Sequence, residues 1–524
     1  MPRLTRRTVL ATALATPALA TPALATNLRA ATLRFVPHQG LGWLDPSWWP
    51  FVETRNHSWM VYDTLYGLDA EGIAQPQMAE GHTLENDGRI WRIRLREGLV
   101  FHDGTPVRAQ DCVASITRWG THAMMGQSLL RATASLSAPD DRTILFRLAE
   151  RFPLLPEALG DRTMQVCAIM PARLAEHSDT RVVDEVVGSG PYRFLPDDYA
   201  PWRRAAYARH ERYLPRAGGT AAFTAGPKLA HFDRVEWVAM PDHDAALAAL
   251  RDGTVDWWEA PPPAHHEAIA ADRRLALRVH DRAGYMATLR MNHLTAPFDD
   301  PRVRRAVLRA VDQRAFMEAA TAAPVQRRTG VGFFSPASPM ARPAPATPDE
   351  AAARVALQAA GYRGEVVMVL VISDLPEPRA MALAGAEMLA RIGFNVQVDH
   401  VPVRNLVARL LRTQPAGAGG WSVVIGYWPG HDLWHPGMHR YLRASGRDAE
   451  VGWPSSEGLE ALRRAWLAAP DGKQRKAIAA DAQAQALEDL PYIPLGMWTR
   501  PTAYAGGLTG MLDGFPLFWN LRRG

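Results

Sequence analysis

The segment LENDGRIWRIRLREGLVFHDGTPV, residues 84–107, decides the fold class of this chain. From Trp91 to Arg96 apolar residues and arginines alternate soon after an Asp-Gly turn, and this pattern predicts a half-buried strand. A second turn at residues 102–104 leads into VRAQDCVASITRW, whose apolar positions suit one face of a short helix. We therefore expect an α/β region with antiparallel strands over about residues 60–170.

The stretches downstream predict alternating strands and helices. EVVMVLVI, residues 365–372, is apolar after its first residue, as in a strand that is covered on both faces. A helix through residues 379–391 and a strand over residues 394–401 follow, which predicts a parallel pair joined by a right-handed crossover. A helix capped by Asp300 precedes them, and residues 244–258 hold a helix and then a strand.

The length and composition predict more than one lobe. The chain has 524 residues, of which 47% are hydrophobic and 22% charged, and single cores stop growing near ~250–300 residues. No flexible linker separates two halves, so we expect the chain to pass between two α/β lobes more than once. No block of basic residues with interleaved aromatics is present, so a nucleic-acid partner is not expected.

The first residues, MPRLTRRTVLATALATPALATPALA, have the pattern of a twin-arginine export signal. Arg6 and Arg7 precede a small-residue stretch that ends in Ala-x-Ala exits, and the Leu/Ile run of a membrane span is missing. We expect residues 1–26 to be removed, with the mature chain beginning near Thr26 or Asn27. No cysteine follows the cleavage region, so we predict a soluble periplasmic protein without a lipid anchor.

The chain contains two cysteines, Cys112 and Cys167. They could form a disulfide in an oxidising compartment, or they could remain as buried free thiols. The sequence alone does not give the Cα separation that would decide between the two.

Motifs of common catalytic sites are missing from the sequence. We find no Gly-x-Ser-x-Gly elbow, phosphate-cradling glycine loop, His-Glu-x-x-His or paired-cysteine metal spacing. Ser189 lies between two glycines, but a proline follows at once, which favours a structural turn over a nucleophile. An enzyme is therefore not expected.

Six segments together resemble the peptide/nickel type, family 5, of solute-binding proteins that serve ABC importers. They are VYDTLYGLDAEG, PQMAEGHTLENDGRIWRIRLREGLVFHDGTPVRAQD, VGSGPYRF, ALAALRDGTVD, MNHLTAPFDDPRVRRAVLRAVDQ and VALQAAGYRG. The resemblance implies a two-lobed periplasmic binding protein fold of the Venus flytrap kind, type II and cluster C-like, with an extra subdomain in lobe I. Lobe I would comprise residues 27–282 and 498–524, and lobe II residues 283–497, with the ligand in the cleft between them.

The resemblance also implies a ligand-binding aspartate in lobe II. In peptide-binding members an aspartate of a Gly-Trp…Asp-x-x-x-Pro stretch pairs with the ligand's α-ammonium group, and Asp432 and Pro436 match that position. The spacing to the tryptophan is one residue longer here. Tyr427 and Trp428 would lie beside Asp432 in the cleft. Alternatively, Asp432 caps the turn before Pro436 or pairs with Arg440.

Other candidate ligand-binding residues come from both lobes. Arg412, or its neighbour Arg409, could offer a guanidinium to a ligand carboxylate, although solvent-facing helix charges have the same pattern. In lobe I the resemblance implies a cleft rim that includes Trp48, Trp49, Phe51 and Glu53.

Three histidines, His431, His435 and His439, recur at intervals of four residues, as metal ligands on a helix do. Pro436 disrupts such a helix, so we expect solvent-exposed or loop-capping histidines and no bound metal or cofactor.

The expected function is capture of a small peptide or peptide-like solute and its delivery to the permease and ATPase subunits of an inner-membrane ABC importer, by a monomer. The alternative ligands are a nickel chelate, haem or another non-peptide solute.

Overall fold

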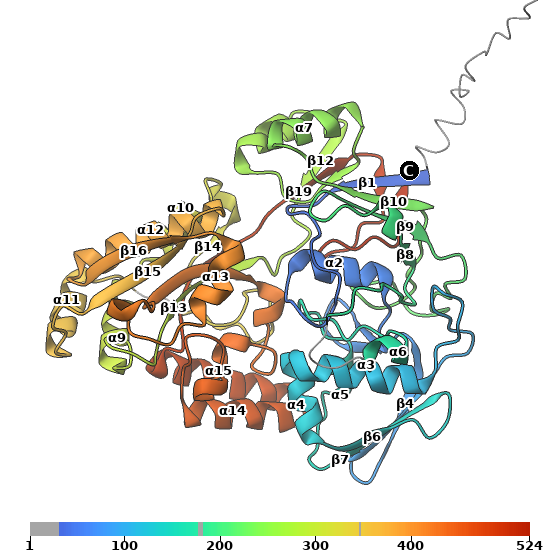
Figure 1. Cartoon of the computed structure of the whole chain (residues 1–524), viewed down its shortest axis with the longest axis horizontal. Helices are drawn as coiled ribbons and strands as arrows, with labels where there is room; N and C mark the ends of the chain where they lie inside the picture. Colours follow the sequence, from blue (N-terminus) through green and yellow to red (C-terminus); the bar gives the residue numbers. More distant parts are fainter. Residues whose placement is uncertain (1–30, 177–181, 345–346) are drawn as a thin grey trace, which may run out of the picture.

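The computed structural model describes residues 31–176, 182–344 and 347–524. Figure 1 shows two bodies side by side, one built mainly from the first half of the chain and one mainly from the second half. We call them lobe I and lobe II. Within the described ranges no helix combines the length and the apolar character that crossing a membrane requires.

Lobe I contains a seven-stranded sheet with the order β12-β19-β11-β1-β10-β9-β8. The central strand β1 runs parallel to both of its neighbours, and the strands outside them are antiparallel. The strands are β1 (Thr32–Val36), β8 (Tyr192–Phe194), β9 (Arg204–Arg209), β10 (Arg234–Val238), β11 (Trp257–Trp258), β12 (Leu275–Arg278) and β19 (Thr502–Ala505). Helices α2 (Val52–Val61), α6 (Ala172–Ala175), α7 (His243–Asp252) and α8 (His266–Ala270) belong to the same lobe, as do two small sheets, β2 (Tyr66–Leu68) with β3 (Ala74–Pro76), and β20 (Leu508–Thr509) with β21 (Arg522–Arg523).

A second, antiparallel sheet of lobe I has the order β4-β5-β7-β6. It confirms the strand predicted from residues 84–107, because Trp91, Ile93 and Leu95 of β5 are buried and the arginines between them are not. The elements of this subdomain are β4 (Ala79–Glu85), β5 (Ile90–Leu95), β6 (Thr133–Ser137), β7 (Thr143–Leu148), α3 (Ala109–His122), α4 (Met124–Ala132) and α5 (Leu155–Leu159). Both cysteines are buried free thiols in this region.

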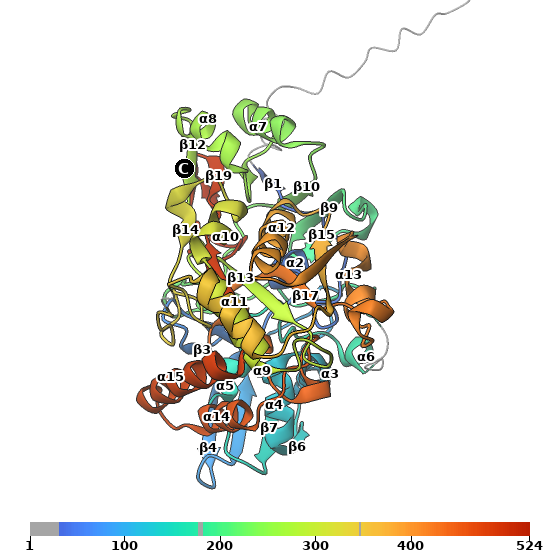
Figure 2. The same cartoon turned by 90° about the vertical axis from the view of Figure 1, so that its left-hand side faces the viewer.

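Lobe II contains a six-stranded sheet with the order β14-β18-β13-β17-β15-β16. Its strands are β13 (Tyr285–Met291), β14 (Arg327–Arg328), β15 (Val366–Ile372), β16 (Asn395–Val401), β17 (Val423–Pro429) and β18 (Ile493–Trp498). Its helices are α9 (Pro301–Ala310), α10 (Gln313–Ala320), α11 (Glu350–Ala359), α12 (Pro376–Arg391), α13 (Val403–Leu410), α14 (Glu457–Ala468) and α15 (Gly472–Asp489). Helices α9 to α12 share one apolar core with the sheet. Figure 2 shows this lobe from the side of these helices.

The local patterns of lobe II form as predicted. β15 and β16 are parallel and are joined through α12. The apolar run of β15 is buried from Val369 to Ile372. Asp300 caps α9 by accepting a hydrogen bond from the backbone N–H of Arg302 at 2.7 Å. In lobe I the strand expected at residues 255–258 begins only at Trp257, because the N–H of Val255 bonds back to Ala249 at the end of α7.

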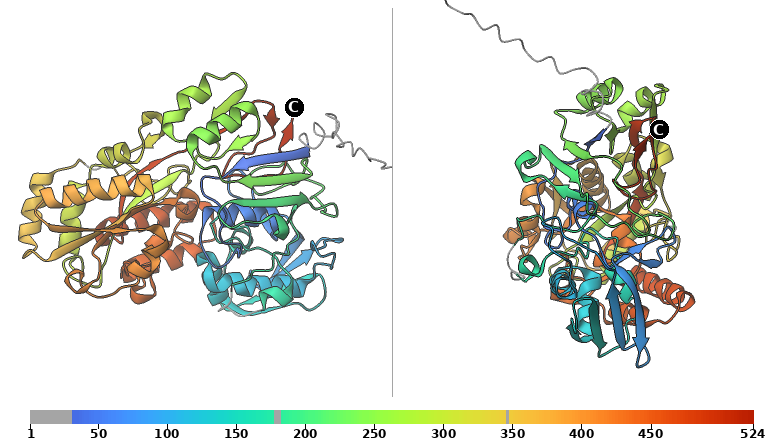
Figure 3. Two further views of the ribbon diagram at one scale, coloured as in Figure 1. Left: turned by 45° about the horizontal axis from the view of Figure 1, so that its top comes forward. Right: turned by 90° about the vertical axis from the view of Figure 1, so that its right-hand side faces the viewer.

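The chain crosses between the two large sheets twice. β12 of lobe I is followed by β13 of lobe II, and β18 of lobe II is followed by β19, which returns to lobe I between β11 and β12. Figures 1 and 3 show this carboxyl-terminal return in red beside β1. The lobe boundaries at residues 282 and 498 stay a prediction.

The lobes also meet along an apolar contact, which we call the interlobe seam. A Cβ atom added at Gly437 of lobe II would lie 2.9 Å from Met125 Sδ of α4 and 3.0 Å from Leu467 Cδ2 of α14. Beside it Arg443 Nη1 donates a hydrogen bond to Gln127 Oε1 at 2.7 Å. One continuous core cluster includes residues of both lobes at this contact, so the lobes lie closed on each other.

Candidate ligand-binding cleft

Asp432 lies in a 3-10 turn, Gly430–Leu433, that begins where β17 ends. The turn faces lobe I, and the backbone N–H of Met164 donates a hydrogen bond to Asp432 Oδ2 at 3.2 Å. The carboxylate is 6% exposed, and Oδ1 has no hydrogen-bond partner among the described residues. A buried acceptor without a donor is costly, so Oδ1 marks a place where a donor from outside the chain would be stabilised.

Burial sets the electrostatics of this point. It raises the pKa of Asp432 to about 6, although Arg55, the Met164 N–H and Arg440 all lower it. Burial also raises the pKa of Asp161 in lobe I to about 7, and the neighbouring Asp432 carboxylate adds to this effect. The Asp432 carboxylate of lobe II therefore disfavours the ionised form of Asp161 in lobe I. A cation placed between them would relieve that repulsion.

Tyr427 and Trp428 are adjacent on β17 and have different neighbours, as alternating strand residues do. The Trp428 ring lies under the Arg440 guanidinium at 4.8 Å and packs edge-on against Tyr441 at 5.6 Å. Its indole N–H lowers the pKa of Asp432, although it lies outside hydrogen-bond geometry. Trp428 is thus beside Asp432, as expected from the resemblance.

Tyr427 belongs to an aromatic group at the interlobe crossing. It packs edge-on against Tyr285 at 5.2 Å and Trp498 at 5.1 Å, and Arg500 lies over these rings. Arg500 also pairs with Glu377 at 2.6 Å. Tyr427 and Trp428 therefore contact separate groups of residues at this end of lobe II.

The three histidines do not converge. His431 Nε2 lies 3.0 Å from Asp281 Oδ1, His435 stacks on Trp466 with ring centroids 4.3 Å apart, and His439 Nε2 lies 2.9 Å from the carbonyl of Phe333. In the described part of the chain no three His, Cys, Asp or Glu residues form a group that could hold a metal ion.

The expectation of solvent-exposed histidines is wrong for His431 and His439, which are buried at 4% and 0% exposure. His439 does cap the following turn, since its side chain accepts a hydrogen bond from the N–H of Leu442. Lobe I covers His431 through Asp281, Phe223 and Phe515, whereas His439 is buried within lobe II against Phe333 and Tyr492.

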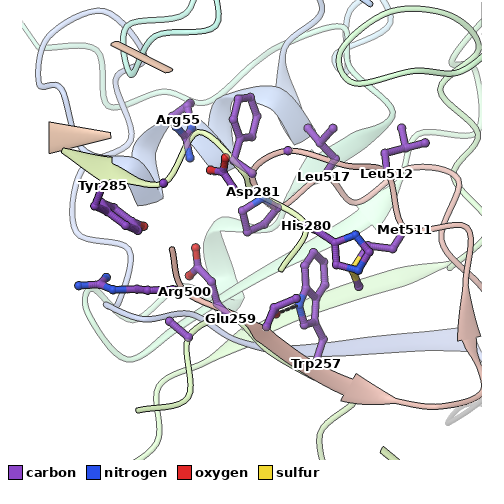
Figure 4. A pocket seen from close by; sticks show the side chains of 16 residues that line it. Arg55, Trp257, Glu259, His280, Asp281, Tyr285, Arg500, Met511, Leu512 and Leu517 are labelled. Carbon is purple, nitrogen blue, oxygen red and sulfur yellow. Dashed lines mark hydrogen bonds between the residues drawn. The ribbon is translucent and has the colours of Figure 1, made fainter. Parts of the chain in front are cut away.

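A pocket of about 580 Å³, counting its opening to solvent, lies at the crossing between the lobes (Figure 4). Charged side chains of both signs line it: Arg55 and Glu259 from lobe I, Asp281 from the first crossing, and Arg500 from the second. Arg55 comes from α2 and is 2% exposed. Each of Arg55 and Asp432 shifts the other's pKa, which places the pocket and the Asp432 carboxylate in one electrostatic site.

Glu53 takes part in a bridge within lobe I. His38 lies between two carboxylates, with Nε2 at 2.9 Å from Glu53 Oε1 and Nδ1 at 2.9 Å from Glu259 Oε2. Burial disfavours the imidazolium, but Glu259 and Glu53 overcome this effect and raise the pKa of His38 well above its ordinary value. The charged His38 therefore fixes Glu53 and Glu259 in place.

Trp49 and Phe51 lie in an aromatic group at the surface of lobe I. Trp43 stacks on Phe51 with centroids 6.5 Å apart and lies 6.0 Å from Trp49, while Trp202 packs edge-on against Trp43. Trp48 contacts His122 instead, with centroids 4.9 Å apart. Trp49 and Phe51 thus lie in one aromatic group around Trp43. Phe51 directly precedes α2, the helix that carries Glu53 and Arg55.

Arg412 and Arg409 lie at the other end of β17. Arg409 pairs with Asp399 at 2.8 Å and donates to Gly420 O at 2.8 Å, and Arg412 donates to Gly419 O at 3.3 Å. The seven residues of β17 separate these glycines from Asp432, a distance of about 20 Å along a strand. The structure therefore does not bring Arg412 into the cleft.

Five charged residues of the site were not among the expected ligand contacts: Arg55, Glu259, Asp281, Arg500 and Asp161. One pattern in the sequence does point to α2: its residues from Glu53 to Ser58 are all polar. In the structure all of them are buried. A helix that is polar all round and still buried must face other polar groups. The partners of this helix are scattered along the chain, from Trp43 at 11 residues to Glu259 at 203 residues, and share no local pattern.

Comparisons with known proteins agree with this architecture. A family model for bacterial extracellular solute-binding proteins, family 5 Middle, matches residues 74–449. The chain is 33% identical over 488 residues to a Sinorhizobium fredii protein described as a probable peptide ABC transporter periplasmic-binding protein, y4tO, and the match covers 90% of this chain and 89% of that protein.

Two solved structures have the same fold. DppA from Helicobacter pylori, in complex with the peptide STSA, has a TM-score of 0.78 at 19% identity and covers 95% of this chain and 99% of its own. AgaA from A. tumefaciens R10, in complex with agropinic acid, has a TM-score of 0.77 at 21% identity and covers 94% and 99%. They confirm the two-lobed fold, and the matched family is one of binding proteins, not of enzymes. The chain belongs to the bacterial extracellular solute-binding proteins of family 5.

Proposed function

We propose that the protein binds a short peptide or a peptide-like amine between its lobes and presents the closed complex to the permease and ATPase subunits of an inner-membrane ABC importer. The observation that carries the proposal is the unpartnered Oδ1 of Asp432, buried between the lobes. An ammonium group there would meet Asp432 and lie near Asp161, and would offset the repulsion between the two carboxylates. The peptide-transport description of the Sinorhizobium fredii relative supports the same ligand class.

The test is native mass spectrometry of protein purified from the periplasm of its own host. A peptide-like amine of discrete mass should co-purify and should be exchanged by a pool of di- and tripeptides. N-acetylation of the pool should abolish the exchange, because the acetylated nitrogen carries no charge. Exchange by N-acetylated peptides as efficient as by free ones would overturn the ammonium site.

We further propose that residues 1–26 direct export by the twin-arginine route and that the mature protein is a soluble monomer without a lipid anchor. These residues lie outside the described part of the chain, and the arginine pair Arg6-Arg7 in the sequence supports the proposal. Replacing both arginines by lysine should leave the precursor in the cytoplasm. An intact mass that begins at Thr26 or Asn27, and a monomer mass from light scattering, complete the test.

A further inference from the structure

Four side chains pack on one another across the boundary between the lobes, and we call them the aromatic latch: Phe223 and Arg162 of lobe I, and His431 and Trp434 of lobe II. The His431 ring stacks on both Phe223 and Trp434, with centroids 5.4 and 6.0 Å apart. The Arg162 guanidinium carbon lies 4.5 Å from the centroid of the Trp434 ring and 5.2 Å from that of Phe223. Separating the lobes would break the contact of Phe223 with His431 and that of Arg162 with Trp434.

The backbone of lobe I is strained where it presents Phe223 to lobe II. Phe223 has a φ of +47°, in the left-handed region that bulky residues rarely adopt. Its ring also occupies the space of a side chain at Gly514, because a Cβ atom there would lie 2.5 Å from Phe223 Cε2. The next residue is fixed within lobe I, since the Thr224 N–H donates to the carbonyl of Leu68 at 3.0 Å. Strain of this kind persists where the surrounding structure enforces it, and it clusters at functional positions.

The contacts of the aromatic latch are shielded from water. Arg162 is 4% exposed and Phe223 is 7% exposed. A cation over an aromatic ring is attracted more strongly when water is excluded, and stacked rings add to the area that they bury. Two residues after Arg162, the Met164 N–H donates its hydrogen bond across the boundary to Asp432 at 3.2 Å. All of these contacts are made by the chain's own residues and need no solute.

We propose that the aromatic latch holds the two lobes closed in the absence of solute, so that the closed form is the resting state and opening precedes solute entry. This inference concerns the ligand-free protein and does not depend on which solute the cleft takes. A ligand shifts an equilibrium between open and closed forms only by its differential affinity for the two. A latch built from the protein's own side chains supplies part of that closing free energy before any solute arrives.

The test is hydrogen exchange, resolved to single amides, on the ligand-free protein. The Met164 N–H bonds to the other lobe, so its exchange reports opening of the lobes, whereas the Thr224 N–H bonds within lobe I beside Phe223. In Phe223→Leu and in Trp434→Leu, Met164 should exchange at least about tenfold faster than in wild type, and Thr224 should exchange as before. Small-angle scattering should show a larger radius of gyration for the double variant.

Trp202→Leu is the matched control. Trp202 also belongs to lobe I and also has a left-handed backbone, with a φ of +64°, but its ring packs on Trp43 of the same lobe. Its substitution should leave the exchange of Met164 unchanged.

The remaining outcomes overturn the proposal. If Met164 exchanges at the wild-type rate in both latch variants, these contacts do not hold the lobes together. If Thr224 is accelerated as much as Met164 in both variants, the substitutions loosen lobe I and do not open the cleft. If Met164 of ligand-free wild type exchanges as fast as an unstructured amide, the resting state is open. This last measurement decides the matter even if a variant does not fold.

Discussion

Replacing Asp432 by asparagine changes the charge of the cleft but hardly changes its shape. Without ligand the ionised carboxylate is unfavourable, since its pKa of about 6 lies above the ordinary 3.8. That difference corresponds to about 3 kcal/mol at a pH above 7, because one pKa unit equals ~1.4 kcal/mol. The Met164 N–H can still bond to the amide oxygen of asparagine. We therefore expect ligand-free Asp432→Asn to be more stable than wild type at pH 8 by up to about 3 kcal/mol.

The sign of this effect depends on pH. The folded wild type keeps a proton on Asp432 between the ordinary pKa of 3.8 and the raised value of about 6, so its stability relative to the variant is lost as the pH rises through that window. The gain of Asp432→Asn should thus be near zero at pH 4 and complete above pH 7. Chemical denaturation of the two proteins at both pH values measures it directly.

Ligand binding should respond in the opposite direction. Asp432→Asn removes the partner of a buried ammonium, which costs on the order of 3–5 kcal/mol, and the affinity for a dipeptide should fall more than ~100-fold. A turn-capping aspartate would give the reverse result, with lower stability of the ligand-free variant and nearly unchanged affinity. Calorimetry at pH 8 separates the two cases, and unchanged affinity in Asp432→Asn would refute the ammonium site.

Three further predictions use other observables. Affinity for a dipeptide should fall as the pH drops below about 6, by at most about tenfold per pH unit, because protonated Asp432 cannot pair with an ammonium group; a flat calorimetric profile from pH 7 to 4.5 would contradict this. Because the lobes already lie closed, the scattering curves of ligand-free and saturated protein should superimpose, and a smaller radius of gyration with ligand would show that the ligand-free lobes open by hinge motion near residues 282 and 498. Thiol labelling of unreduced, denatured protein should modify both Cys112 and Cys167, which are free in the structure; absence of labelling would show a disulfide.

The sequence predicted those parts of the fold that depend on local patterns. The alternation in β5, the apolar run of β15 and the capping residue Asp300 each determine their own element, because the hydrogen bonds and the buried face lie within or beside that element. The short strand β11 was predicted too long, since the N–H of Val255 is already used at the end of α7. Such competition for one donor leaves no pattern in the residues themselves.

The site was harder to predict because its members come from distant parts of the chain. Asp432 and Trp428 could be placed through the resemblance, and they do lie together. Glu53 was proposed as a ligand contact, and it pairs with His38, whose second partner Glu259 is 221 residues away from it. Arg55 had no pattern of its own: an arginine in a helix usually faces solvent, and only the burial of α2 shows that this one does not.

The position of β19 has a consequence for how the chain is made. Among the described strands β12 pairs only with β19, and β19 comes from residues 502–505, which are translated long after β12. The larger sheet of lobe I therefore stays open at one edge until residues 502–505 have been translated, and β18, which lobe II needs between β13 and β14, is completed only shortly before. A shortened nascent chain would carry two unfinished sheets with exposed edges, which invite aggregation.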